Sequence, residues 1–153
     1  MGQSQPEQQV GSHKMYKGSC LCGSIQIELK GPISDIIHCH CSLCRKSSGT
    51  AYATNGFIEA KDLKVIDAEN QLAFFERVEG KKRHFCRQCG SPVYSSNAAN
   101  PERYRIRLGI LDSEITERPI SHNFITSKAE WDDMDAELPR YDRYEPSRDV
   151  FSL

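Results

Sequence analysis

The sequence lacks long apolar runs and any large excess of one charge, and both absences exclude classes of protein. No apolar stretch approaches the roughly 20 residues that a membrane-spanning helix requires. Lysine and arginine total 20 against 21 aspartate and glutamate, which gives a formal net charge of -1. This balance predicts no general attraction to nucleic acid or to an anionic membrane.

The N-terminus also lacks a targeting pattern. Residues 1–10 are polar and glutamine-rich, without the basic-then-apolar order of a signal peptide. We therefore expect a cytoplasmic protein whose thiols stay reduced. The polar residues 1–13 are predicted to be a disordered leader, and residues 14–153 a single domain.

No stretch shows a long helical period, and the ordered region is predicted to be mainly β. Residues 24–30 alternate cleanly, with Ile25, Ile27 and Leu29 facing inward, as in a half-buried strand. A short helix is expected to start at Ser127, because residues 127–130 fit a capping box. Further strands are expected at 33–41, 50–57, 63–66, 72–77, 82–85, 93–95 and 104–108, turns at 46–49 and 79–80, and a tail held to the domain by Trp131, Leu138 and Tyr141.

The arrangement of the cysteines is unusual, because all seven fall into three short groups. Cys20 and Cys22 are two apart, whereas Cys86 and Cys89 are three apart and precede Gly90, which is free to take a positive φ. Two such pairs can close a tetrahedral zinc site, which would stabilise a small β domain. The alternative is that some of the four are buried free cysteines.

Cys39, Cys41 and Cys44 form the remaining group. Cys39 and Cys41 are expected to share one face of a strand, with His40 pointing away, and Cys44 to return through a turn. Three thiolates leave a fourth ligand to water or substrate, which is typical of catalytic zinc. The alternative is that His38, His40 or His84 completes a structural site. All-thiolate tetrahedral sites suit iron as well as zinc.

Five basic residues lie next to the cysteine groups in the sequence, two directly after Cys44 and three shortly before Cys86. Such cations would offset the negative charge of a zinc–trithiolate centre and could bind the carboxylates of an anionic substrate. The alternative for each is an ordinary solvated surface. The five are Arg45, Lys46, Lys81, Lys82 and Arg83.

The order of the cysteines resembles that of a known family. Residues 18–23 read GSCLCG, residues 39–49 read CHCSLCRKSSG and residues 85–90 read FCRQCG. Together with 109–112, 119–122 and 128–131, these segments resemble the glutathione-dependent formaldehyde-activating enzymes, also called the centromere-protein-V-like group. The resemblance runs from about Lys17 to Leu138.

The resemblance implies an Mss4-like β-tent, in which small curved antiparallel sheets are pinned by two zinc ions per chain. It implies structural zinc on Cys20, Cys22, Cys86 and Cys89, and catalytic zinc on Cys39, Cys41 and Cys44. It further implies a carbon–sulfur lyase of the S-(hydroxymethyl)glutathione synthase kind, with a small thiol and an aldehyde as partners. The alternative is a non-enzymatic zinc-binding interaction module. As general acid or base, His38, Tyr52 and His84 are suggested only by their proximity in the sequence.

Overall fold

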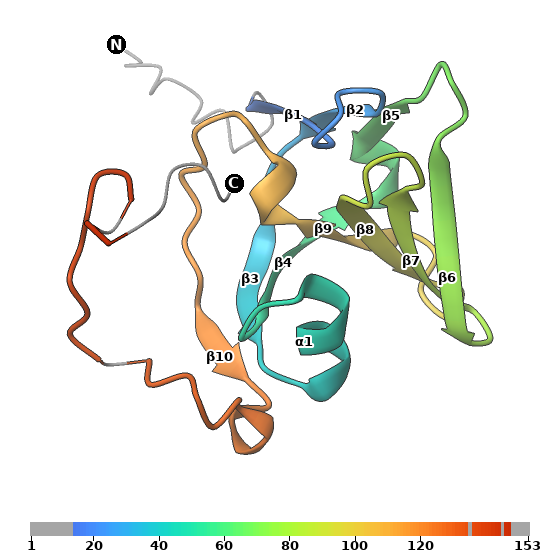
Figure 1. Cartoon of the computed structure of the whole chain (residues 1–153). Coiled ribbons are helices and arrows are strands. Elements are labelled where there is room, and N and C mark those ends of the chain that lie inside the picture. Colours follow the sequence, from blue (N-terminus) through green and yellow to red (C-terminus); the bar gives the residue numbers. More distant parts are fainter. Residues whose placement is uncertain (1–13, 135, 145, 148–153) are drawn as a thin grey trace, which may run out of the picture.

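The computed structural model describes residues 14–134, 136–144 and 146–147, and the predicted leader, residues 1–13, lies outside them. The described chain is mainly β, which confirms the predicted class (Figure 1). Its strands are β1 (Met15–Ser19), β2 (Gln26–Lys30), β3 (Ser34–Cys39), β4 (Ala53–Glu59), β5 (Leu63–Ile66), β6 (Leu72–Val78), β7 (Lys81–Cys86), β8 (Pro92–Asn97), β9 (Arg103–Arg107) and β10 (Ser121–Asn123). Its helices are α1 (Ser42–Ser48) and the 3₁₀-helices η1 (Ala60–Asp62), η2 (Leu108–Ile110) and η3 (Ile125–Ser127).

The strands form two sheets. One has three antiparallel strands in the order β1-β2-β5, and the other has seven in the order β10-β3-β4-β9-β8-β7-β6. Every pairing in the larger sheet is antiparallel except that of β10 with β3, which is parallel. The expected small antiparallel sheets are therefore present, with one parallel strand that the local sequence pattern did not predict.

The hydrophobic core joins the two sheets. Ile25, Ile27 and Leu29 are buried, as the alternation of this segment predicted. They belong to the same cluster as Ile36 of β3 and Ile106 of β9. Burying an isoleucine or leucine side chain stabilises a fold by about 1.5–3 kcal/mol, so this cluster is the main apolar contribution to stability.

The larger sheet has a second face, and its cross-strand register shows which residues share it. Arg83 pairs with Ser95, Ser95 with Arg105, and Asn55 with Arg107. Directly paired residues of antiparallel strands point to the same side of the sheet, and successive residues alternate. Basic and polar side chains therefore gather on the face opposite Ile106 and the core.

Three local predictions at or beside the helices were wrong. Residues 46–49 form no isolated turn but the end of α1, which Cys41 caps and Gly49 terminates in a left-handed conformation (φ 72°). The predicted strand 33–41 ends at Cys39, because Cys41 already caps this helix. Ser127 starts no helix and instead ends η3.

The predicted anchoring of the tail was also wrong for the residues named. Trp131 is 66% exposed, Leu138 73% and Tyr141 52%. Their surfaces therefore lie largely in solvent, whereas Ala129 is the buried apolar residue of this region. Across the described ranges, no helix combines the length and apolarity needed to cross a membrane.

Candidate metal centres and the adjoining cavities

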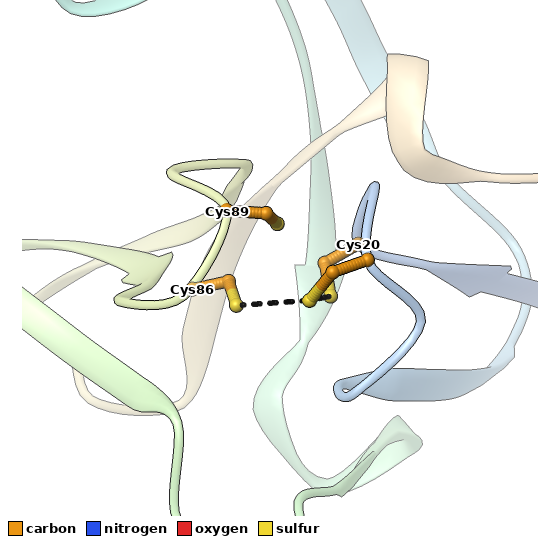
Figure 2. A group of neighbouring side chains, drawn as sticks. Cys20, Cys86 and Cys89 are labelled. Carbon is orange, nitrogen blue, oxygen red and sulfur yellow. Dashed lines mark hydrogen bonds between the residues drawn. The ribbon is translucent and has the colours of Figure 1, made fainter.

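The structure brings Cys20, Cys22, Cys86 and Cys89 together, with all four sulfur atoms within 4.8 Å of one another. The first two follow β1, and the others lie at the end of β7 and in the turn after it. Figure 2 shows Cys86 and Cys89 opposite Cys20. Sγ of Cys22 is 3.6 Å from that of Cys20 and 3.8 Å from that of Cys86. A zinc–sulfur distance of about 2.3 Å places tetrahedral sulfurs about 3.8 Å apart, so the donor set fits zinc.

Each cysteine pair in this cluster is shaped by a backbone turn closed by glycine. Gly90 has a φ of 81°, as expected, and its N–H donates to the carbonyl of Cys86 at 2.7 Å. Gly23 also has a φ of 81°, and its N–H donates to the carbonyl of Cys20 at 3.0 Å. Because only glycine takes this conformation without steric cost, the two turns hold their sulfurs in convergent positions.

Neighbouring hydroxyls favour thiolates in this cluster. Ser91 hydrogen-bonds with Sγ of Cys89 at 3.3 Å and is the main reason that the pKa of Cys89 falls to about 5. The hydroxyl of Ser24 lies 3.1 Å from Sγ of Cys22 and lowers its pKa, although desolvation and the adjacent thiols of Cys20 and Cys89 raise that pKa overall. Hydroxyl donors stabilise the charged sulfur that a metal ion binds.

Cys39, Cys41 and Cys44 form the second group, again with sulfurs within 4.8 Å of one another. Sγ of Cys41 accepts the backbone N–H of Cys44 at 3.3 Å, so the cap of α1 and the cluster share one sulfur. Burial, with the two adjacent thiols, raises the pKa of Cys44 to about 12. Three crowded thiols that resist joint ionisation are suited to a divalent cation, whose charge offsets theirs.

The three candidate histidines lie elsewhere. Among the described residues, no imidazole or carboxylate joins the three sulfurs within 4.8 Å. His84 hydrogen-bonds Ser96 at 3.0 Å and stacks on Tyr94. His38 hydrogen-bonds Thr54 at 2.8 Å. The described protein groups at this centre are therefore three sulfurs.

His40 directly follows β3 and is fully buried. Its ring contacts those of Tyr52 and His122. Its Nε2 lies 2.8 Å from Nδ1 of His122, and its backbone N–H donates to the carbonyl of Asn123. These contacts tie the Cys39–Cys41 segment to β10. His122 was missed by sequence reasoning, because only the parallel pairing of β10 brings it beside His40.

We expect His122→Ala to lower the free energy of unfolding by about 1–3 kcal/mol, because it removes the hydrogen-bond partner of a buried imidazole. Chemical denaturation followed by circular dichroism measures this loss. Ile120→Ala, at a side chain that is 66% exposed, is the control and should change stability by less than about 0.5 kcal/mol. Equal stability of both variants would show that the histidine pair does not hold this segment.

A cavity of about 300 Å³ lies against the three-cysteine group. Its wall contains no acidic side chain among the described residues. Of the five predicted cations, Lys81 and Arg83 line this cavity, whereas Arg45, Lys46 and Lys82 do not. The wall includes five basic residues: Arg77, Lys81, Arg83, Arg105 and Arg107.

Two of these arginines have polar groups removed from water. Arg107 hydrogen-bonds Asn55, and burial lowers its pKa. Nε of Arg83 is buried and has no hydrogen-bond partner within the described part of the chain. A buried donor without an acceptor is costly, so Arg83 is a candidate for contact with an anionic ligand.

Sequence reasoning missed Arg77, Arg105 and Arg107. The alternation of residues 104–108 was recognised, but it does not tell which face is solvent and which faces a site. A usable signal was present: Arg105 and Arg107 share one face two residues apart, so two cations point the same way.

The sequence pattern of the glutathione-dependent formaldehyde-activating enzyme family matches residues 15–127. A Halomonas elongata protein named as a candidate enzyme of this kind is 29% identical over 124 residues, which cover 76% of this chain and 79% of the relative. A Podospora anserina protein named in the same way is 28% identical over 78 residues, covering 49% of this chain and 36% of the relative.

A solved structure is also similar. The crystal structure of a Rhodobacter sphaeroides protein superposes with a TM-score of 0.57 at 27% sequence identity. The match covers 69% of this chain and 98% of that protein. The similarity therefore extends over about two thirds of this chain.

Proposed function

The chain belongs to the glutathione-dependent formaldehyde-activating enzyme family, and we propose that it is a zinc-dependent carbon–sulfur lyase acting on a thiol–aldehyde adduct. In the synthetic direction the thiol sulfur bonds to the aldehyde carbon, and the thiol proton ends on the former carbonyl oxygen. In the lyase direction the same carbon–sulfur bond breaks, the hydroxyl loses its proton and the thiol regains one. No oxidant or reductant is needed.

The two cysteine groups have different roles in this proposal. Cys20, Cys22, Cys86 and Cys89 supply four ligands, which complete the usual tetrahedral coordination of structural zinc. Cys39, Cys41 and Cys44 supply three ligands, and the substrate sulfur would be the fourth. Zinc at this second centre would favour the thiolate form of the substrate and stabilise the sulfur as a leaving group.

One observation carries the proposal: the three-cysteine group lies against a cavity with five basic residues and no acidic residue among those that line it. A thiol with carboxylates, such as glutathione, matches this wall because arginine binds carboxylates through paired N–H donors. The basic face would hold the carboxylates and direct the sulfur toward Cys39, Cys41 and Cys44. The chain would thereby restrict the position of both reacting groups.

The reaction itself is testable by NMR exchange spectroscopy with glutathione and formaldehyde. We expect the zinc-loaded protein to accelerate exchange between free and adduct formaldehyde above the spontaneous rate, and zinc removal to abolish the acceleration. Metal analysis on the same sample establishes the loading. Spontaneous rates in a sample with both sites loaded would exclude this reaction and favour the non-enzymatic interaction module.

Arg83→Gln provides a sharper prediction about the thiol. We expect KM for glutathione to rise about tenfold with kcat little changed, because one charge-assisted hydrogen bond of about 1.4 kcal/mol is lost from substrate binding. Steady-state exchange rates over a range of glutathione concentrations measure both constants. Added salt should reduce the difference between wild type and variant, since the lost contact is ionic.

Lys82→Gln is the matched control for this substitution. Lys82 precedes Arg83 in β7 but lies outside the cavity wall, with its ammonium 4.2 Å from the ring centroid of Phe74. The Lys82→Gln substitution removes one positive charge, as Arg83→Gln does, from the adjacent position of the same strand. Equal increases in KM for both variants would indicate a general effect of net charge instead of a contact at Arg83.

A further inference from the structure

A second and larger cavity adjoins the cysteine cavity. It has a volume of about 550 Å³ and lies between α1 and strands β6 to β9. Four residues line both cavities, so the two are direct neighbours: Leu43, Arg77, Arg83 and Arg107. A group bound beside the three cysteines could therefore extend directly into the larger space.

The wall of the larger cavity differs in chemistry from that of the smaller. In addition to the shared arginines, its lining includes two phenylalanines on the arginines' face of the sheet, Phe75 and Phe85, and also Pro92 and Tyr94. His84 also lines the cavity, but it pairs with and stacks on Tyr94, which pairs with Ile106, so these two rings belong to the core side of the sheet. Ring-lined cavities of this size are typical of sites that bind apolar parts of small molecules.

Phe75 is the least shielded of these rings. It is 59% exposed, although it lies on the same face of β6 as the arginines, directly paired with Arg83 of β7. An exposed ring beside a guanidinium forms a surface on which a second aromatic ring can stack. A ligand ring at this position would remove Phe75 from water.

Neither glutathione nor formaldehyde, the two compounds in the name of the family, would use these walls. Formaldehyde has one carbon and fills little of the cavity. Glutathione is a polar peptide without a ring, and the basic wall of the smaller cavity already matches its carboxylates. The aromatic cavity is therefore unexplained by the thiol and is placed where the other half of the adduct would extend.

We propose that the larger cavity binds the substituent of the aldehyde, and that the substrate is an adduct of an anionic thiol with an aldehyde bearing an aromatic ring. The inference rests on the proposed function and specifies its substrate class. The reacting carbon lies at the junction of the two cavities, with the carboxylates of the thiol on the basic wall and the ring near Phe75. The bonds formed and broken are those of the general reaction.

Binding of stable thioethers tests the second cavity without any need for turnover. S-benzylglutathione and S-methylglutathione differ only in the group attached to sulfur. We expect isothermal titration of the zinc-loaded protein to give at least tenfold tighter binding of the benzyl compound. Equal affinities would overturn the inference, because the cavity would then contribute nothing to ring binding.

Substitutions on the two faces of β6 assign the effect to the cavity. Phe75→Ala is expected to reduce the affinity ratio to about two, because it removes the stacking surface. Phe74→Ala is the matched control: Phe74 is 53% exposed and lies outside the cavity wall, so the ratio should remain as in wild type. A ratio that survives Phe75→Ala, or falls equally in both variants, would overturn the assignment.

A filling substitution from the opposite wall provides an independent check. Ser47→Trp places a large side chain in the larger cavity from α1, at a position that does not line the cysteine cavity. It should weaken binding of the benzyl compound at least tenfold and leave that of the methyl compound within twofold. Equal weakening of both ligands would contradict the inference, because it would show damage beyond the aromatic cavity.

Turnover measurements separate this inference from the proposed function. With glutathione, we expect kcat/KM for benzaldehyde to exceed that for formaldehyde at least tenfold. Acceleration of formaldehyde exchange with equal thioether affinities would overturn only the aromatic specificity. Acceleration of neither aldehyde by the zinc-loaded protein would overturn the proposed function.

Discussion

Cys86→Ala is expected to abolish cooperative folding of the domain. Cys86 is fully buried at the end of β7, and its cluster joins the turn after β7 in the large sheet to the turn after β1 in the small sheet. Structural zinc sites contribute about 10–16 kcal/mol of binding free energy, whereas whole domains are stable by only about 5–15 kcal/mol. Losing one of four ligands therefore removes a contribution comparable to the total.

Thermal unfolding by circular dichroism and zinc analysis of the same preparation measure this effect. We expect the variant to be insoluble, or to show no cooperative transition. Addition of a strong chelator to the wild-type protein should reproduce the result, because it removes the metal and leaves the side chain intact. Ser24→Ala is the control, since it removes a neighbouring hydroxyl and retains all four sulfurs.

A folded Cys86→Ala variant with a wild-type melting temperature would contradict this prediction. The hydrophobic cluster centred on Ile25, Ile27 and Ile106 would then be sufficient to hold the sheets together. The four cysteines would in that case be dispensable for stability, whatever metal they bind.

Much of the fold was predictable because its determinants are local. Strict alternation at Ile25, Ile27 and Leu29 identified both β2 and its buried face, and residues 63–66 coincide with β5. The grouping of the cysteines was also predictable, since two short pairs and one short triplet leave few ways to converge. The structure brings together the same two sets that the spacing indicated.

The unpredicted features depend on contacts between distant segments. Nothing near His122 indicates that β10 pairs in parallel with β3, so its contact with His40 was not foreseen. The helix α1 is only seven residues long, too short for its period to be recognised, and a cysteine supplies its cap. For such features the sequence pattern limits the possible strand pairings and helix positions but does not determine which of them forms.

The basic face illustrates the same limit at the site. Alternation in β9 separates Ile106 from Arg105 and Arg107 and predicts that the arginines avoid the core. It does not show that β4, β7 and β8 continue this face or that the three cysteines lie beside it. Only the sheet order and register bring the arginines and Asn55 into one wall.

Cys44→Ala is expected to give the opposite result to Cys86→Ala: a folded protein without catalysis. Cys44 lies in a small cluster with Cys39, Ala53, Ile37 and Cys41, separate from the main core. Removing one buried sulfur there should cost about 1–2 kcal/mol of stability, which is well within the stability of a typical domain. The four-cysteine cluster retains all four sulfurs.

Catalysis should fall at least 10³-fold in this variant, because the contribution of a catalytic metal ion is several kcal/mol and 1.36 kcal/mol corresponds to tenfold in rate. Zinc analysis should show one metal per chain in place of two, while the circular dichroism spectrum remains that of wild type. Ser48→Ala, also in α1 but outside the cysteine cavity, is the control and should keep both metals and the rate.

The contrast between the two cysteine variants tests the division of roles more strictly than either variant does. Each variant loses one buried thiol, so a general effect of removing a cysteine would change the stability of both variants alike. If Cys44→Ala unfolds as Cys86→Ala does, the second centre is a structural one and the proposed catalytic role fails. If Cys44→Ala stays folded with full activity, the reaction takes place without the three-cysteine centre, and the site must be sought elsewhere on the chain.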